Sequence, residues 1–171
     1  MKKLLLAALA AIAVSSCGVQ TTVIPKAVNT INSVSLDELN LEREDYTIIN
    51  TISAEAVITY ESTFNAIKMA DENNEFSLNY YKTRKGWKCR YTGILKFGYL
   101  SNDYVGYTTD IIQPEDVARR LVIYRLINMA QLDGSDGLIE PVIATSLEQS
   151  GKQVVFKTTV TAKTIKIKTD N

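Results

Sequence analysis

Residues 80–91, YYKTRKGWKCRY, gather the side chains of this chain that are best suited to binding an anion. The candidate ligand-binding residues are Lys82, Arg84, Lys85, Trp87, Lys88 and Arg90. Cations of this kind attract phosphate or carboxylate groups, and the interleaved aromatic rings offer flat surfaces for stacking. The same pattern is also typical of a β-strand whose charges are solvated while its rings enter the core. A glycan, a lipid phosphate and an acidic protein face are the candidate ligands.

A second candidate for chemistry is Cys17, one of only two cysteines in the chain. It follows two lysines, an apolar run over residues 4–14 and two serines. A permanent transmembrane helix needs about 20 apolar residues, so this run is too short to serve as one. The order of a positive start, an apolar core and small residues is typical of a secretory signal.

The segment Val14-Ser15-Ser16-Cys17 resembles a bacterial lipobox. The resemblance implies cleavage before Cys17, a diacyl group on its sulfur and a further palmitate-type chain on the new amine. Each buried methylene of such chains contributes about 0.8 kcal/mol, so two or three chains hold a protein at a membrane. Gly18, where some lipoproteins have aspartate, favours the outer membrane. We expect a periplasm-facing outer-membrane lipoprotein with lipidation at Cys17; an ordinary secretory signal with an incidental cysteine is the alternative.

Composition excludes several classes of function. The chain has no histidine, which removes serine–histidine and cysteine–histidine nucleophiles and the commonest zinc ligand. Basic and acidic residues number 19 each, and the leader contains Lys2 and Lys3, so the mature chain has 17 basic and 19 acidic residues. That balance and the predicted export argue against a nucleic-acid partner. Cys89 has no partner within a lipidated chain, and we expect it to be a buried apolar residue rather than a reactive thiol.

Carboxylates are the remaining candidates for catalysis. They fall into three groups: Glu42, Glu44 and Asp45; Asp71, Glu72 and Glu75; and Glu115 with Asp116. Any pair brought together by the fold would suit a histidine-free hydrolase, which stays an alternative. The segment LDGSDGLIE, residues 132–140, misses the ligand spacing of an EF-hand. We therefore expect no metal site, no cofactor and a non-enzymatic protein.

The elements that must position these residues are mostly strands. Residues 1–16 are the predicted signal peptide, 17–35 the lipidated N-terminus with a flexible tether, and 36–171 a single domain. Six strands are expected, of which the first is short; they cover residues 35–41, 45–62, 76–83, 87–100, 137–149 and 153–169. Phe64, Ile67 and Met69 suggest a short helix instead, which ends near Asn73 and Asn74. The buried side of the last strand changes near residue 163, which indicates a bulge or a shift of register.

Residues 114–132 form the strongest predicted helix. Pro114 suits its first position, acidic residues follow, and Gly134 suits its C-terminal end. Apolar residues occupy nearly the whole circumference, so the helix is either deeply sandwiched or covered by another subunit. The predicted fold class is α+β, an antiparallel sheet of about six strands with this helix packed on it.

Three segments, DYTIINTISAEA, PEDVARRLVIYRLINMAQLDGSDGLIEPVI and VTAKTIKIK, resemble those of uncharacterised lipoproteins of the Bacteroidota. The layout is also distantly similar to that of the small YbjQ-like proteins, which assemble as rings. The shared motifs are structural, so the resemblance implies no catalytic residue. The lipobox, the missing histidine and the broad apolar helix favour a cell-envelope binding or assembly module, with a homo-oligomer or an envelope protein as its partner and the membrane as its anchor.

Overall fold

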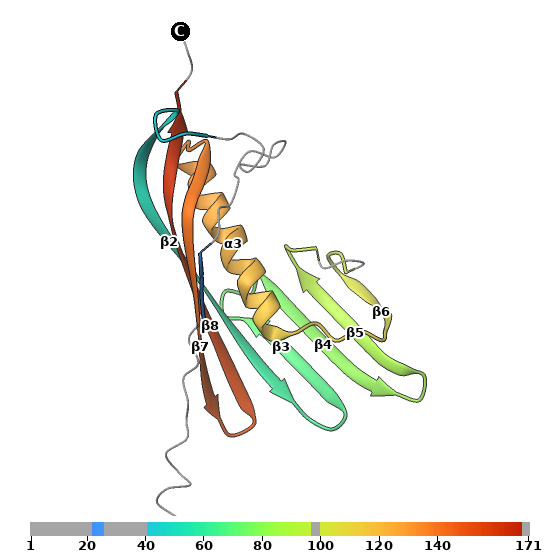
Figure 1. Cartoon of the computed structure of the whole chain (residues 1–171). Coiled ribbons are helices and arrows are strands. Elements are labelled where there is room, and N and C mark those ends of the chain that lie inside the picture. The colour runs from blue at the N-terminus through green and yellow to red at the C-terminus, as the bar shows by residue number, and fades with distance from the viewer. Residues whose placement is uncertain (1–21, 26–40, 97–99, 169–171) are drawn as a thin grey trace, which may run out of the picture.

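A computed structural model describes residues 22–25, 41–96 and 100–168, and these form one antiparallel sheet and one helix (Figure 1). The elements are β1 (Thr22–Pro25), β2 (Tyr46–Ser62), β3 (Ala66–Asp71), β4 (Phe76–Thr83), β5 (Gly86–Gly93), β6 (Tyr104–Thr108), α3 (Pro114–Leu132), β7 (Gly137–Ser150) and β8 (Gln153–Ile167). The strand order across the sheet is β1-β7-β8-β2-β3-β4-β5-β6. Seven strands, β2 to β8, make up the body of the domain, and the short β1 pairs with β7 at one edge.

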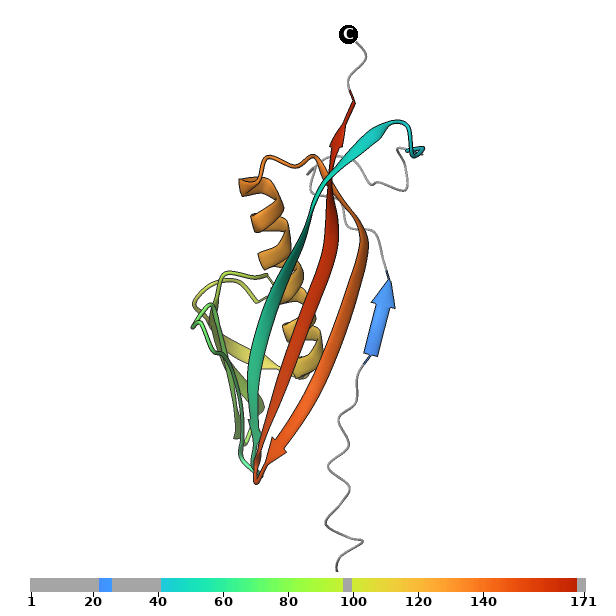
Figure 2. The ribbon, with the colours of Figure 1, turned by 90° about the vertical axis from the view of Figure 1, so that its left-hand side faces the viewer.

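The sheet is built around three long strands and a shorter four-stranded extension. Figure 1 shows β7, β8 and β2 side by side, with β3 to β6 beside the N-terminal half of α3. Figure 2 shows α3 on one face of the long strands, and no described helix covers the opposite face. α3 contacts β2, β8 and β7. The α+β class is therefore confirmed, in a form that is mostly sheet.

The predicted count of about six strands was too low. Residues 66–71 form β3, where a short helix was expected from Phe64 to near Asn73 and Asn74. Ile67, Met69 and Asp71 are buried while Lys68 and Ala70 are exposed, which is the period of two that a strand requires. β6 is a further strand within residues 101–112, where the sequence indicated a loop followed by a short extended piece that was not counted among the six strands. The short strand expected at 35–41 lies outside the described residues except for its last position, and β1 lies within the range predicted as a tether.

The helix has the predicted bounds, Pro114–Leu132. Its first turn carries Glu115 and Asp116 at the positive end of the helix dipole, and Gly134 adopts a φ of 71° just beyond its end. The buried face consists of Val117, Ala118, Leu121, Val122, Leu126 and Ala130. This face packs within the chain itself, whereas Leu132 at the C-terminal end is 90% exposed.

Bulges next to β8 produce the change of buried side that was expected near residue 163. Ile49 of β2 is an extra residue opposite β8, and residues 140–141 of β7 provide another on the other side. Thr164 and Ile165 are consequently both buried, although neighbours along a regular strand point to opposite faces. The extra residues lie in the flanking strands and not in β8.

The aromatic core of the extension joins β4 and β5 to the helix. Phe76, Tyr80 and Tyr91 are fully buried, and the rings of Phe76 and Tyr91 lie 5.5 Å apart between centroids. The Tyr91 hydroxyl donates to the Leu95 carbonyl at 2.5 Å, and the Tyr80 hydroxyl accepts from the Ile112 amide at 3.1 Å. The first bond holds β5 to the loop that follows it, and the second holds β4 to the segment that leads into α3. No helix of the described part is long and apolar enough to span a membrane.

Candidate functional site

The β4–β5 hairpin divides its side chains between the two faces of the sheet. Tyr80, Cys89 and Tyr91 face the core and are fully buried, whereas Tyr81 and Lys88 are exposed on the face opposite α3. Successive side chains of a strand point to opposite faces, so the sequence motif splits into two functions. Its inward residues hold the hairpin in place and its outward residues are available to a ligand.

Five side chains form one surface, which we call the β4–β6 outer face. They are Tyr81 of β4, Lys88 and Arg90 of β5, and Val105 and Tyr107 of β6. Lys88 lies directly across from Tyr81 on one side and from Tyr107 on the other, and Arg90 lies across from Val105. Tyr81, Val105 and Tyr107 are 44%, 56% and 54% exposed. A cation between two tyrosines therefore stands open to solvent.

A shallow hollow of about 300 Å³ lies on this face. It is lined by Tyr81, Lys88, Cys89, Arg90 and Val105. Only the backbone of Cys89 can contribute to the lining, because its side chain is fully buried on the core side. The hollow is thus bordered by two cations and two exposed apolar groups, a combination that suits an anion with a flat or aliphatic part.

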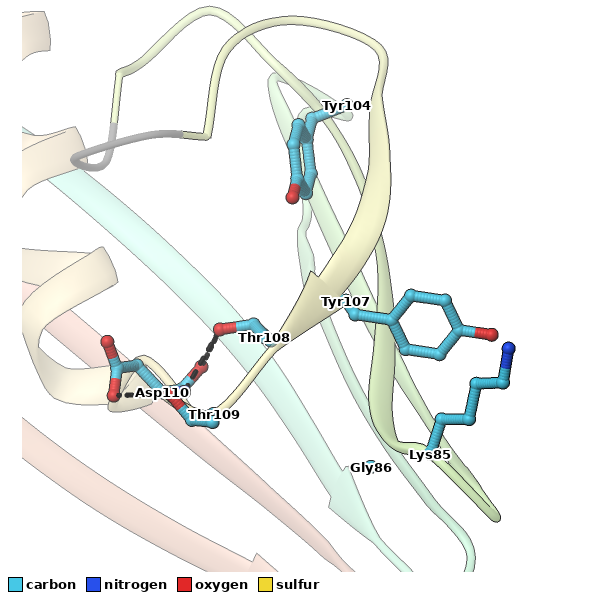
Figure 3. A pocket seen from close by; sticks show the side chains of 7 residues that line it. All are labelled: Lys85, Gly86, Tyr104, Tyr107, Thr108, Thr109 and Asp110. Atoms are coloured by element: carbon cyan, nitrogen blue, oxygen red, sulfur yellow. Dashed lines mark hydrogen bonds between the residues drawn. The ribbon is translucent and has the colours of Figure 1, made fainter.

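A larger hollow of about 480 Å³, which we call the β6 hollow, lies beside the end of β6 (Figure 3). Its lining residues are Lys85, Gly86, Tyr104, Tyr107, Thr108, Thr109 and Asp110. Figure 3 shows the side chains of Lys85 and Tyr107 pointing toward each other, with Tyr104 directed to the other side of β6. The hollow therefore extends around the end of the strand, and Tyr107 connects it with the β4–β6 outer face.

Two turns, each held by hydrogen bonds of a threonine hydroxyl, position residues that line the β6 hollow. Thr83 Oγ1 donates to the Gly86 carbonyl at 2.7 Å and accepts from the Lys85 amide at 3.2 Å. Gly86 has a φ of 116°, a conformation that side chains disfavour. After β6, Thr108 Oγ1 accepts from the Asp110 amide at 3.0 Å and donates to its carbonyl at 3.1 Å. Each threonine satisfies backbone groups that would otherwise need water, so both turns are held in one shape.

Glycine at position 106 allows Tyr104 to cover β6 from the core side. A Cβ atom at Gly106 would overlap the hydroxyl and ring of Tyr104. The ring lies across the glycine, which compensates for the missing side chain in the strand. β6 is thus covered on its inner side by its own residue, and its exposed side chains belong to the outer face.

The other candidate residues of the hairpin lie apart from Lys88 and Arg90. Lys82 and Trp87 form a cross-strand pair on the opposite face, where Trp87 is half-buried against the core. The Lys82 amine lies 4.5 Å from the ring centroid of Phe64, a cation–π arrangement. Arg84 is exposed in the β4–β5 turn, next to Lys85 of the β6 hollow. The six predicted residues therefore do not form one site.

Cys89 is fully buried, as expected of an apolar core residue. Burial raises the pKa of its thiol above the ordinary value, although contact with the Gly106 backbone opposes the shift. A raised pKa disfavours the thiolate, which is the nucleophilic form. Cys89 is therefore a packing residue beneath the outer face. Cys17, the predicted lipidation site, lies outside the described residues.

The carboxylates of Asp71 and Glu75 do come together, but they share one guanidinium. The Arg125 Nη2 atom lies 2.7 Å from Asp71 Oδ2 and 2.6 Å from Glu75 Oε2. The Asp71 side chain is inaccessible to solvent, so a substrate cannot reach it. In the part of the chain that the structure describes, no three aspartate, glutamate or cysteine side chains are grouped to hold a metal ion.

Sequence reasoning placed a short extended piece in this segment but did not count Tyr104, Val105 and Tyr107 of β6, or Asp110 after it, among the candidate residues. The alternation in YVGYT is a strand signal, but two flanking loops and a central glycine obscured it. Comparison with known proteins adds no further assignment: no family model, no curated protein and no solved structure matches the chain. The functional argument therefore depends on the geometry of the β4–β6 outer face and the β6 hollow.

Proposed function

We propose that this chain is a non-enzymatic binding or assembly module of the cell envelope, and that it binds an anionic partner through the β4–β6 outer face. The observation that carries this proposal is the exposed row in which Lys88 lies between Tyr81 and Tyr107. Such a row offers an ammonium group and two rings to the same ligand. Exposed apolar groups beside charges are typical of interaction surfaces.

The two cations of this face differ from five cations on α3 and β8. Those five form salt bridges of 2.6–3.0 Å with carboxylates; they are Arg119, Arg125, Lys157, Lys163 and Lys166. No ion pair among the described residues joins Lys88 or Arg90 to a carboxylate. Their charge is therefore available to a partner.

Charge is also concentrated in this part of the chain. Residues 76–110 carry Lys82, Arg84, Lys85, Lys88, Arg90 and Lys96 against only Asp103 and Asp110. The whole chain has equal numbers of basic and acidic residues. A local positive field on a nearly neutral molecule attracts an anionic partner to one end without making the protein a general polyanion binder.

The lipobox-like segment supports the proposal that this binding takes place in the cell envelope. Cleavage and acylation at Cys17 would make the chain an outer-membrane lipoprotein of the Bacteroidota type, facing the periplasm. The predicted tether would then keep the domain within reach of the membrane while leaving the outer face free to meet an envelope component. A homo-oligomer and an envelope protein remain the two kinds of protein partner proposed.

Charge reversal tests the binding surface. The mature chain with Cys17→Ser is titrated with poly-glutamate, heparin and phosphatidylglycerol vesicles, alone and with Lys88→Glu plus Arg90→Glu. We expect the double variant to bind at least tenfold more weakly, about 1.4 kcal/mol or more. The matched control, Lys157→Glu plus Lys163→Glu on β8, changes net charge equally at exposed positions. Absence of any binding by the parent chain, or equal weakening in the control, would contradict the proposal.

A second candidate function is binding of a glycan or a lipid headgroup through hairpin residues 80–91. The β6 hollow favours it, because two tyrosines, two threonine hydroxyls, Lys85 and Asp110 surround one space. Rings stack on sugar faces and the polar groups bond to hydroxyls or phosphates. Selective binding of heparin or of the vesicles in the same titration would support this candidate. The hydrolase alternative gains no support, because Asp110 is the single carboxylate lining the two hollows.

A further inference from the structure

β6 is the terminal strand of the sheet, and its outer edge is the starting point of a further inference. At the opposite end of the strand order, β7 is covered by the chain's own β1, which pairs with it over four residues. Within residues 22–25, 41–96 and 100–168, no strand lies beyond β6. One edge of the sheet is therefore paired with a further strand of the same chain, whereas the described residues add no strand to the other edge.

The middle of β6 lacks the features that usually prevent pairing with another strand. Natural edge strands carry charges, proline or bulges, because bare main-chain groups invite a partner strand. Val105, Gly106 and Tyr107 include neither charge nor proline, and β6 pairs with β5 through five consecutive residues without a register shift. A regular, uncharged edge with exposed Val105 and Tyr107 side chains suits the addition of a strand.

The positive charges near β6 indicate which kind of strand could pair with it. Lys88 and Arg90 lie one strand in from the edge, directly across from Tyr107 and Val105. An added strand would lie about 4.8 Å beyond β6, or about 10 Å from β5, a gap that a lysine or arginine and a facing glutamate can bridge. A second copy of this chain would bring identical cations to the shared edge, where they repel. An acidic segment complements them.

We infer that the partner of the β4–β6 outer face is an extended acidic polypeptide segment that pairs with the edge of β6 as an added strand. This inference rests on the proposed function and names the partner class. The segment would alternate acidic side chains, directed to the face of Lys88 and Arg90, with small or apolar ones directed to the side of α3. Its end would enter the β6 hollow, where Lys85 and Tyr107 point toward each other.

Two peptides of equal charge test strand addition. The mature chain with Cys17→Ser is titrated with the peptide TEVEVEVT, blocked at both ends, and with a version N-methylated at alternate residues. N-methylation removes the amide donors and crowds the paired edge but leaves the charge unchanged. We expect the N-methylated peptide to bind at least tenfold more weakly. We also expect the unmodified peptide to slow hydrogen exchange of amides within 104–108 by tenfold or more.

The outcomes separate this inference from the proposed function. Equal binding of both peptides, lost in Lys88→Glu plus Arg90→Glu, would overturn strand addition and leave anionic binding intact. Binding to heparin or vesicles with none to either peptide would also overturn it. A dimer by light scattering whose contact protects 104–108 would assign the edge to a second copy instead. Absence of binding by the parent chain to the peptides, to poly-glutamate, to heparin and to the vesicles would end both proposals. A Tyr107→Pro variant that folds by circular dichroism but still binds the unmodified peptide with full affinity would likewise contradict strand addition.

Discussion

At the scale of single residues, side chains along β5 alternate between the core and the outer face, and this determines which of them can bind a partner. Cys89 and Tyr91 enter the core, while Lys88 and Arg90 remain on the outer face. A sequence that mixes cations and rings can predict the presence of a binding surface. It cannot predict which rings take part, because that depends on the partners that each strand meets. Tyr107 of β6 completes the row and lies outside the hairpin altogether.

The burial of Cys89 predicts that its thiol is unreactive in the folded chain. In the Cys17→Ser mature chain it is the remaining cysteine. Because burial excludes the reagent and raises the pKa of the thiol, we expect no reaction with an aromatic disulfide reagent at pH 8 over minutes. In 6 M guanidinium, roughly the concentration that unfolds most domains, the reaction should be complete in the same time. Rapid reaction of the native chain would place Cys89 at the surface.

Asp136 predicts a stability that depends on pH. The hydrogen bond from Lys166 at 2.8 Å lowers the pKa of the Asp136 carboxyl below its ordinary 3.8, and the Ile167 amide donates to it as well. The unfolded chain therefore takes up this proton at a higher pH than the folded chain. The carboxylate stabilises the fold fully above about pH 5, and this contribution is lost as the pH falls through the lowered pKa.

We expect Asp136→Asn to lower the free energy of unfolding at pH 7, and the difference from the parent chain to shrink steadily below about pH 4. Urea unfolding followed by circular dichroism at several pH values measures it. Glu148→Gln, at an exposed carboxylate of β7, serves as the control and should leave unfolding nearly unchanged. A difference for Asp136→Asn that stayed constant from pH 7 to pH 3 would assign the effect to packing instead of charge.

At the scale of elements, local signals predicted most of the framework. Pro114 and the first acidic turn indicated α3 with its observed bounds, and turn residues indicated both long hairpins. β3 was mistaken for a helix because Phe64, Ile67 and Met69 fit a helical spacing over a short window. In the fold, pairing with β2 and β4 on both sides outweighs that local preference.

A buried ion-pair contact between elements joins residues far apart in the chain, so no local pattern could predict it. Arg125 of α3 donates to Asp71 at 2.7 Å, to Glu75 at 2.8 Å and to the Glu55 carbonyl of β2 at 2.6 Å. Asp71 Oδ2 also accepts the Asn73 amide at 3.0 Å. The guanidinium thereby fastens the helix to β2 and to the β3–β4 turn, and so sets the position of the extension that carries the outer face.

We predict that Arg125→Met destabilises the fold by about 3–5 kcal/mol, because it leaves the buried Asp71 carboxylate without its ion partner. The matched control is Arg119→Met on the same helix. Its pair with Glu115 is partly exposed, and its loss should cost about 0.5 kcal/mol or less. Urea unfolding measures both. Adding Asp71→Asn to Arg125→Met should recover part of the lost free energy of unfolding. Equal destabilisation by the two arginine variants would contradict the role proposed for Arg125 in joining α3 to the sheet.

At the scale of the whole molecule, the proposed binding surface and the proposed attachment point belong to different parts of the chain. The proposed anchor precedes the domain in sequence, at Cys17, while the proposed binding surface is formed by β4 to β6. The long strands β2, β7 and β8 with α3 make one framework to which the extension is fixed. An anchored framework with a basic face on its extension suits a protein that presents this face to another envelope component.

The proposed lipid anchor at Cys17 predicts the cell fraction in which the protein is recovered. With Cys17→Ala, lipidation cannot occur, and we expect most of the protein to move from the membrane pellet to the soluble fraction after cell lysis and ultracentrifugation. The parent chain should resist extraction by high salt and alkaline carbonate, because the proposed attachment is by acyl chains and not by charge. Cys89→Ala is the matched control, since it removes the buried cysteine and should leave the protein in the pellet. Recovery of the Cys17→Ala chain in the pellet, resistant to carbonate, would show that attachment does not depend on Cys17 and would overturn the lipoprotein proposal while leaving the outer-face titrations unaffected.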